Sequence, residues 1–130
     1  MMPARKRILV VEDNAALARV VQFNLERAGH DVVVANNGQQ ALAVLAGELP
    51  FDMVVTDQQM PVMTGVELCQ QMRRVARFAH LPVIMLTAKG LELELSQLRD
   101  ELGIAAVLPK PFSPHGLVEA IEELLAAAVS

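Results

Sequence analysis

The chain alternates short runs rich in Val, Ile and Leu with longer amphipathic stretches, and this alternation limits the folds open to it. The runs show little polar alternation, which predicts strands that are buried on both faces. They cover about residues 7–11, 31–35, 52–56, 82–86 and 105–108. Five strand–helix pairs predict an α/β fold with a single doubly wound, five-stranded parallel sheet. We expect the flavodoxin-like (βα)5 arrangement with strand order 2-1-3-4-5.

Apolar residues at helical spacing occupy the stretches between these runs. Five helices are predicted, and the apolar residues of each are given in parentheses. The first includes Leu17 to Ala28 (Leu17, Val20, Val21, Leu25, Ala28), and the second covers about 38–46 (Ala41, Leu42, Leu45). The third begins near Gly65 (Val66, Leu68, Cys69, Met72), the fourth covers about 91–102 (Leu91, Leu95, Leu98, Leu102), and the fifth runs from Pro114 to about Ala127 (Leu117, Val118, Ile121, Leu124, Leu125). The four leucines of the fourth predicted helix fall on one face, and we interpret this face as packing into the core. Leu93 lies off that face. The alternative interpretation is that Leu93 gives a partly exposed apolar patch that binds a partner.

Two of the apolar runs end in acid. The run from Ile8 to Val11 leads into Glu12 and Asp13, and the run that ends at Thr56 leads into Asp57. In doubly wound folds the carboxyl ends of the first and third strands lie side by side, so we expect the three carboxylates to meet. Clustered carboxylates repel one another, and Mg²⁺ prefers oxygen ligands of this kind. The sequence therefore predicts a magnesium site at this edge of the sheet.

Three residues at the same edge could carry out chemistry. Asp57 is the best candidate for a nucleophile, although a carboxylate at a strand end can also cap a turn. Thr87 ends the fourth run, and its hydroxyl could donate to an anionic oxygen or cap the next segment. Lys110 lies between Pro109 and Pro111, where a cis Lys–Pro bond would turn its ammonium inward. A carboxylate, a cation, a hydroxyl and a lysine together suit phosphoryl transfer.

Composition and charge narrow the remaining possibilities. At 130 residues the chain is expected to form one domain, residues 1–130, and its net charge of −4 gives no footprint for nucleic acid. Arg5–Arg7 is interpreted as a solvated flank. The single cysteine, Cys69, excludes an internal disulfide, and His30, His80 and His115 are expected on the surface or in loops. No run is long enough for a signal peptide or a membrane span, which predicts a reduced, cytoplasmic setting.

Four segments, in order, are similar to the receiver domain of the two-component response-regulator family. They are ILVVEDN, VVTDQQMPVMTG, VIMLTA and PKPF, and the resemblance extends over about residues 6–127. It implies a signalling module that accepts a phosphoryl group from a sensor histidine kinase or a histidine phosphotransfer protein. The phosphorylated form would then act on a downstream target or output domain, and a dimer through the faces of the fourth and fifth helices is possible.

The same resemblance assigns roles to the residues at the acidic edge. Asp57 would be the phosphoacceptor, Thr87 the switch hydroxyl and Lys110 the phosphate contact. The implied Mg²⁺ ligands are Glu12, Asp13, Asp57 and the backbone carbonyl of Gln59. Gln58, Gln59 and Lys89 border the path of water to the acyl phosphate, so we expect them to set its lifetime.

The chain departs from the family pattern at one position that bears on output. Val107 stands where the family usually carries an aromatic residue that turns inward on activation, and valine has a stiff χ1 and no hydroxyl. The stretch from Thr87 to Lys110 also looks one residue longer than is common. A degenerate receiver that acts as a phosphorylation-independent scaffold is therefore the alternative function.

Two enzyme or cofactor classes fit less well. A phosphatase of the haloacid-dehalogenase type would need a second aspartate at the position of Gln59. A flavin- or nucleotide-binding domain would need a phosphate-binding loop after the first strand, where this chain has Glu12, Asp13 and Asn14.

Overall fold

A five-stranded parallel sheet forms the centre of the structure, a computed structural model that describes residues 5–110 and 112–129. The strands are β1 (Arg7–Val11), β2 (Asp31–Ala35), β3 (Met53–Asp57), β4 (Val83–Ala88) and β5 (Ile104–Lys110). Their order is β2-β1-β3-β4-β5, and every neighbouring pair is parallel. The predicted fold class and strand order are confirmed, and each predicted strand ends within two residues of the observed one.

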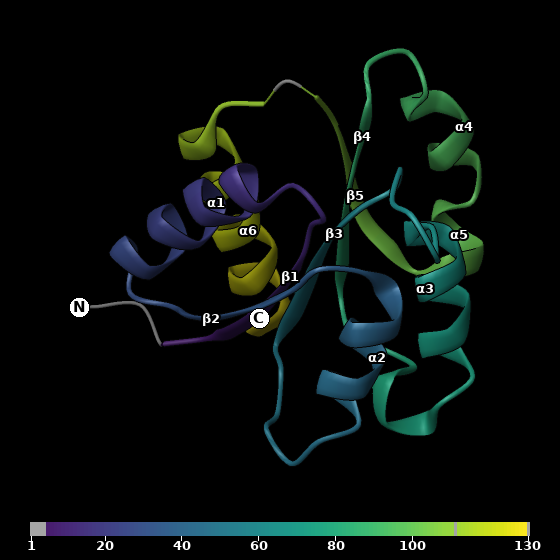
Figure 1. The fold of residues 1–130 in the computed structure, drawn as a ribbon, viewed down its shortest axis with the longest axis horizontal. Helices are drawn as coiled ribbons and strands as arrows, with labels where there is room; N and C mark the ends of the chain where they lie inside the picture. Colours follow the sequence, from purple (N-terminus) through teal and green to yellow (C-terminus); the bar gives the residue numbers. More distant parts are fainter. Residues whose placement is uncertain (1–4, 111, 130) are drawn as a thin grey trace.

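Helices cover both faces of this sheet (Figure 1). They are α1 (Ala15–Arg27), α2 (Gly38–Leu45), α3 (Gly65–Arg73), a 3₁₀ turn η1 (Ala76–Phe78), α4 (Glu92–Gln97), α5 (Arg99–Leu102) and α6 (Pro114–Val129). Helices α1 and α6 lie together on one face, and α2 to α5 lie on the other. In the part of the chain that the structure describes, no helix combines the length and apolarity that crossing a membrane requires.

Alternation along the central strands builds two separate cores. On β1, Ile8 and Val10 pack with residues of α1 and α6, whereas Leu9 and Val11 pack with residues of α2 to α5. Successive side chains of a strand point to opposite faces, so a run that is apolar throughout supplies both cores at once. The central strands are thereby fixed on both sides, and their carboxyl ends are held at one edge.

The strand register brings the predicted site residues to that edge. Thr56 pairs with Val11, so Asp57 ends β3 level with Glu12, and Asp57 itself pairs with Leu86 of β4. On the next pair of strands, Ala88 lies opposite Lys110. Residues from four strands therefore meet at the carboxyl edge.

The segment predicted as one helix over 91–102 is instead two short helices. Helix α4 ends at Gln97 and α5 begins at Arg99, and Leu98 between them has a φ of −92° and a ψ of −2°, which depart from helical values. The Leu98 N–H donates to the Leu95 oxygen, a tighter turn than that of an α-helix. Leu95 and Leu102 are buried as expected, but Leu91 is exposed. Leu93 is 72% exposed, in agreement with the patch alternative.

Two residues differ in burial from what the sequence pattern suggests. Val20 follows the helical spacing of the first predicted helix but is 43% exposed, because the buried side of α1 runs through Ala18, Val21 and Leu25. His30 lies in a loop, as expected, but is buried, with only 4% exposed. It follows the turn that ends α1, and its Nε2 lies 3.6 Å from Oε1 of Glu122 on α6.

The other histidine and cysteine predictions agree with the structure. His80 and His115 are exposed, and Cys69 is buried and free. The suggested cis bond involves Pro111, which lies outside the described residues.

One arginine fixes the turn before β5. Arg73 of α3 donates to the backbone oxygens of Leu102 at 2.7 Å, Phe78 at 2.8 Å and Gly103 at 3.1 Å. Gly103 has a φ of +66°, which suits glycine. These bonds join α3, the end of η1 and the start of β5.

A bulge in β5 lies just after this turn. The pairing shifts from Val83 with Ile104 to Ile84 with Ala106, which leaves Ala105 as the extra residue. Arg99 donates to the oxygens of Ile104 at 3.2 Å and Ala105 at 2.6 Å. A second arginine therefore holds the irregular part of the edge strand.

We expect Arg73→Met to lower the free energy of unfolding by about 2 kcal/mol, because three backbone carbonyls lose a charged donor. Arg74→Met is the matched control, since Arg74 is an exposed neighbour at the end of the same helix. Urea denaturation of both variants gives the comparison. Equal stability of the two variants would contradict the structural role of Arg73.

Candidate functional site

Three carboxylates lie together at the carboxyl edge of the sheet. One ligand oxygen from each of Glu12, Asp13 and Asp57 lies within 4.8 Å of the others. Glu12 and Asp57 are buried, with Asp57 only 2% exposed, whereas Asp13 is exposed. The clustering expected from the ends of β1 and β3 is therefore present.

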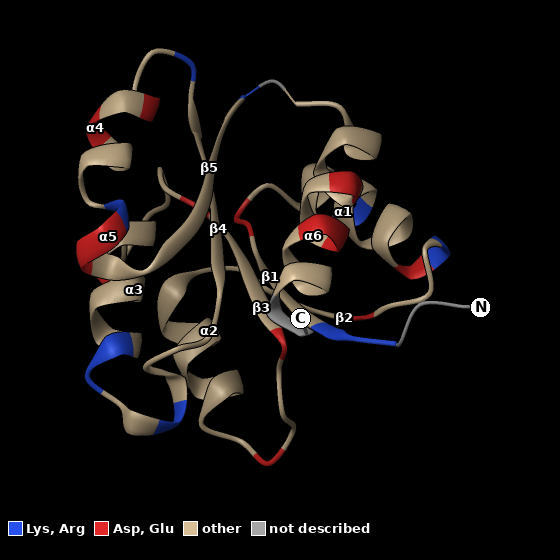
Figure 2. Ribbon diagram, turned by 180° about the vertical axis from the view of Figure 1, so that it is seen from behind, with Lys and Arg blue, Asp and Glu red and all other residues tan. Residues whose placement is uncertain are grey.

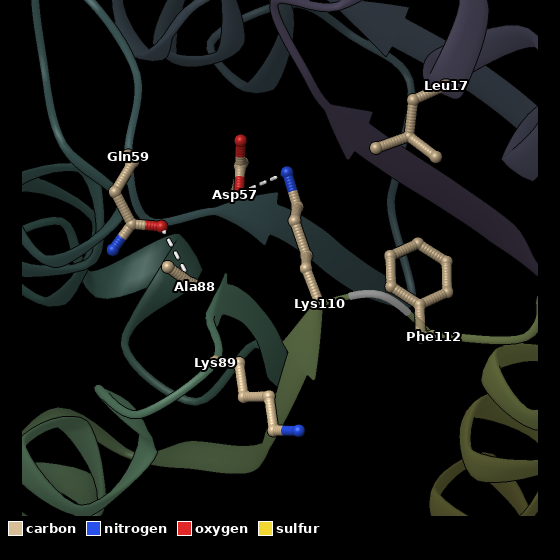
Figure 3. A pocket seen from close by; sticks show the side chains of 7 residues that line it. All are labelled: Leu17, Asp57, Gln59, Ala88, Lys89, Lys110 and Phe112. Atoms are coloured by element: carbon tan, nitrogen blue, oxygen red, sulfur yellow. Dashed lines mark hydrogen bonds and ion pairs between the residues drawn. The ribbon is translucent and has the colours of Figure 1, made fainter.

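Lys110 reaches into this cluster from the end of β5 (Figure 3). Its Nζ forms an ion pair with Oδ1 of Asp57 at 2.8 Å and donates to Oε1 of Glu12 at 3.3 Å. Burial alone would lower the pKa of Lys110, but its interactions with Asp57, and then with Glu12, outweigh that effect and raise the pKa. Lys110 is therefore a fixed positive charge against two buried carboxylates.

The pKa of Glu12 stays raised despite this lysine. Burial raises its pKa, and the charge of Asp57 adds to the rise. The Asn14 N–H, which donates to Oε2 at 3.1 Å, and the ammonium of Lys110 oppose the rise without cancelling it. A further cation at this position would favour the ionised carboxylate.

The donor set fits a hard divalent cation. Carboxylate oxygens are the ligands that Mg²⁺ prefers, and three residues offer them within 4.8 Å of one another. Oδ1 of Asp57 is buried, and the ammonium of Lys110 is the charge paired with it among the described residues. One ammonium thus serves the two buried carboxylates of Asp57 and Glu12, so a further cation would reduce their repulsion.

The loop after β3 is built tightly around Asp57. The Gly65 N–H donates to the Gln58 oxygen at 3.1 Å, and a Cβ on Gly65 would lie 2.6 Å from the Asp57 oxygen. Thr64 caps α3 in a reciprocal capping box with Glu67. Helix α3 therefore begins against the backbone of Asp57 and leaves no room for a side chain at Gly65.

Thr87 is completely buried at the end of β4 and contacts the side chain of Gln59. Gln59 Nε2 donates to Thr87 Oγ1 at 2.9 Å, and Gln59 Oε1 accepts from the Ala88 N–H at 3.0 Å. Sequence reasoning placed Gln59 near the site through its backbone carbonyl but did not find this contact. The contact joins residues 28 positions apart, so no local pattern could have indicated it.

An open pocket of about 540 Å³ adjoins Asp57. Figure 3 shows the side chains that line it, which are Leu17, Asp57, Gln59, Ala88, Lys89, Lys110 and Phe112. The Lys110 ammonium points toward Asp57, and that of Lys89 points away. A phosphorylated group could therefore approach the Asp57 carboxylate from solvent.

Comparison with known proteins decides the family. The sequence matches the response regulator receiver domain family over residues 8–122. The chain belongs to this family. The predicted resemblance is thus confirmed, and receiver domains are signalling modules rather than enzymes of the ordinary kind. Membership in the receiver domain family excludes the phosphatase and the flavin- or nucleotide-binding alternatives.

Relatives of this receiver domain include transcriptional regulators and chemotaxis proteins. It is 38% identical over 120 residues to the alkaline phosphatase synthesis transcriptional regulatory protein PhoP of Bacillus subtilis, a match that covers 92% of this chain and 48% of PhoP. A Campylobacter jejuni chemotaxis protein CheY homolog is 32% identical, with 92% of each chain covered. The chain thus spans about half the length of the first relative and nearly all of the second.

Solved receiver structures share the fold. The chemotaxis response regulator CheY4 of Vibrio cholerae superimposes with a TM-score of 0.84 at 31% identity, over 93% of this chain and 99% of CheY4. The receiver domain of HemR from Leptospira biflexa gives a TM-score of 0.81 at 30% identity, over 93% and 94% of the two chains.

We expect Gly65→Ala to destabilise the receiver domain by about 1–3 kcal/mol, because the added methyl group meets the Asp57 oxygen at 2.6 Å. Gly47→Ala is the control, since its nearest contact is 3.2 Å and Gly47 is exposed. Thermal unfolding followed by circular dichroism measures both. A Gly65→Ala variant as stable as Gly47→Ala would contradict the close packing at Asp57.

Glu12→Gln should stabilise the metal-free protein at neutral pH. The folded chain holds the Glu12 proton more tightly than the unfolded chain, because the pKa is raised on folding. That stabilising contribution is present at acidic pH and is lost as the pH rises through the raised pKa. In EDTA at about pH 7 we expect a gain on the order of 1 kcal/mol, which disappears toward about pH 4. Urea denaturation at both pH values tests this, and a destabilised variant at neutral pH would contradict it.

Proposed function

We propose that this receiver domain accepts a phosphoryl group on Asp57, with Mg²⁺, from a phosphohistidine of a sensor histidine kinase or histidine phosphotransfer protein. The observation that carries the proposal is the Asp57 carboxylate itself. It is buried, pairs with the Lys110 ammonium at 2.8 Å and borders a pocket of about 540 Å³. The phosphorylated form would change which downstream protein or output domain is bound.

The proposed reaction is one displacement at phosphorus. An Asp57 oxygen forms a bond to phosphorus while the bond from phosphorus to the donor imidazole nitrogen breaks. The departing nitrogen keeps that electron pair and takes up a proton from solvent, so the products are an aspartyl phosphate and a free histidine. Lys110, 2.8 Å from Asp57, faces the oxygens on which negative charge lies.

The other site residues have supporting roles in this proposal. Glu12, Asp13, Asp57 and the backbone carbonyl of Gln59 would hold Mg²⁺. When bound, Mg²⁺ neutralises charge on the phosphoryl oxygens. Thr87 would supply its hydroxyl to one of those oxygens after phosphorylation.

Val107 supports a second candidate function. It is half-buried, pairs in register with Met85 and packs against the core formed with α2 to α5. No aromatic ring can therefore turn inward at this position to report phosphorylation. A scaffold that binds its partners without phosphorylation would not need such a ring.

Acidic residues gather on α4, α5 and α6, on either side of β5 (Figure 2). They are Glu92, Glu94, Asp100, Glu101, Glu119, Glu122 and Glu123. A symmetric dimer through the faces of α4 and α6 would bring like charges together, since both copies use the same patch. We therefore propose that such a dimer needs raised ionic strength.

We also propose one receiver domain over residues 1–130 and a cytoplasmic location, where Cys69 stays reduced.

Incubation with acetyl phosphate or a phosphohistidine donor and Mg²⁺ should add one phosphoryl group to the protein, as measured by intact mass. Asp57→Asn should abolish the gain, because an amide oxygen is a poor nucleophile. EDTA should reduce the gain strongly if Mg²⁺ participates. No gain with any donor, for a protein that is folded by circular dichroism, would favour the scaffold function instead.

A further inference from the structure

The side chain of Gln59 stands between two hollows of the surface. One is the pocket that holds Asp57 and Lys110. The other is a cleft of about 290 Å³ between the loop after β3 and helix α4, and Thr87 and Leu95 line it. Gln59 lines both. Its amide therefore lies between the pocket at Asp57 and the side chain of Thr87.

The orientation of this amide is determined by its partners. The backbone N–H of Ala88 can only donate, so the oxygen Oε1 of Gln59 must face it, at 3.0 Å. The nitrogen Nε2 then faces Thr87 Oγ1, at 2.9 Å. Thr87 is 0% exposed, so water does not compete for its hydroxyl. One planar amide thus holds the last two residues of β4 at the same time.

Those two residues carry the uncharged donors next to Gln59 at this edge. A phosphoryl group on Asp57 would bring anionic oxygens that need donors, and Lys110 already faces the carboxylate. The Ala88 N–H is engaged by Gln59, and the Thr87 hydroxyl is tied to Nε2 of the same amide. Neither residue can turn freely toward Asp57 while both bonds are in place.

We propose that Gln59 is a positioning residue that latches Thr87 and Ala88 in the resting state and must release them when a phosphoryl group is present on Asp57. This inference rests on the proposed function of Asp57. Any anion that binds at Asp57 and uses these donors must first break the two bonds, so the latch weakens its binding. Loss of the latch should therefore strengthen the binding of such an anion.

The neighbouring glutamine provides a matched control. Gln58 Oε1 accepts from the Val66 N–H at 2.8 Å, so this side chain holds the start of α3. It has the same chemistry and adjoins Gln59 in the chain. Substitution of Gln58 removes a loop contact and leaves both bonds of the latch in place.

The test uses beryllofluoride, which binds a carboxylate oxygen and copies the shape and charge of a phosphoryl group. The full chain is titrated in Mg²⁺ and followed by amide chemical shifts. Gln59→Ala and Gln59→Leu should each bind about tenfold tighter than the wild type, equivalent to about 1.4 kcal/mol. Gln58→Ala should stay within about twofold of the wild type.

Three outcomes of the titration would overturn the latch. An affinity of Gln59→Ala equal to or weaker than that of the wild type would show that the two bonds do not restrain the site. Tighter binding by Gln59→Ala but not by Gln59→Leu would show that Gln59 only fills space. A gain with Gln58→Ala as large as that with Gln59→Ala would also overturn it, because loop loosening would then explain both.

Amide hydrogen exchange tests the latch without any anion. In Gln59→Ala the Ala88 N–H loses its acceptor, so its exchange should accelerate about tenfold, whereas in Gln58→Ala it should not change. Unchanged Ala88 exchange in Gln59→Ala would overturn the latch. If the wild type fails to bind beryllofluoride, the proposed function of Asp57 is contradicted, and the exchange result still decides whether the latch exists.

Discussion

The contact between Lys110 and the buried carboxylates of Asp57 and Glu12 is the interaction around which this receiver domain is organised. The central strands β1 and β3 are apolar on both faces, so their ends lie in a region that water reaches poorly. Both strands nevertheless end in acid, and one lysine faces two buried charges. The raised pKa of Glu12 shows that this compensation is incomplete. A further cation would therefore favour the ionised form of these carboxylates.

A change at Asp57 can spread through a small number of contacts. Gly65 places the start of α3 against the Asp57 backbone, and Gln59 connects the loop after β3 with Thr87 and Ala88. Beyond Ala88 the chain enters the short helix α4, which carries the exposed Leu93. Position 107 is a valine, and β5 carries no aromatic side chain that could take part in such a change.

The sequence predicted the features that depend on period and on strand ends. Five apolar runs were enough for the sheet, its order and the meeting of Glu12, Asp13 and Asp57. It did not predict the burial of His30, the break at Leu98 or the amide of Gln59, because each depends on contacts between distant segments. His30 Nε2 lies 3.6 Å from Oε1 of Glu122 on α6, the break lets α5 lead into a turn held by Arg73, and Gln59 contacts a residue of β4 that is 28 positions away. Such contacts depend on tertiary packing, which the helix and strand propensities of single residues do not predict.

The proposal that Asp57 receives the phosphoryl group is tested most directly by locating the acyl phosphate in the chain. Borohydride reduces an aspartyl phosphate to homoserine, which peptide mass spectrometry identifies by position. After treatment with a phosphoryl donor and Mg²⁺, we expect homoserine at position 57, and none when the donor is omitted. Homoserine at position 13, 2-amino-5-hydroxypentanoic acid (the reduction product of a glutamyl phosphate) at position 12, or a phosphoryl group on a hydroxyl or imidazole side chain with position 57 unmodified, would contradict the account.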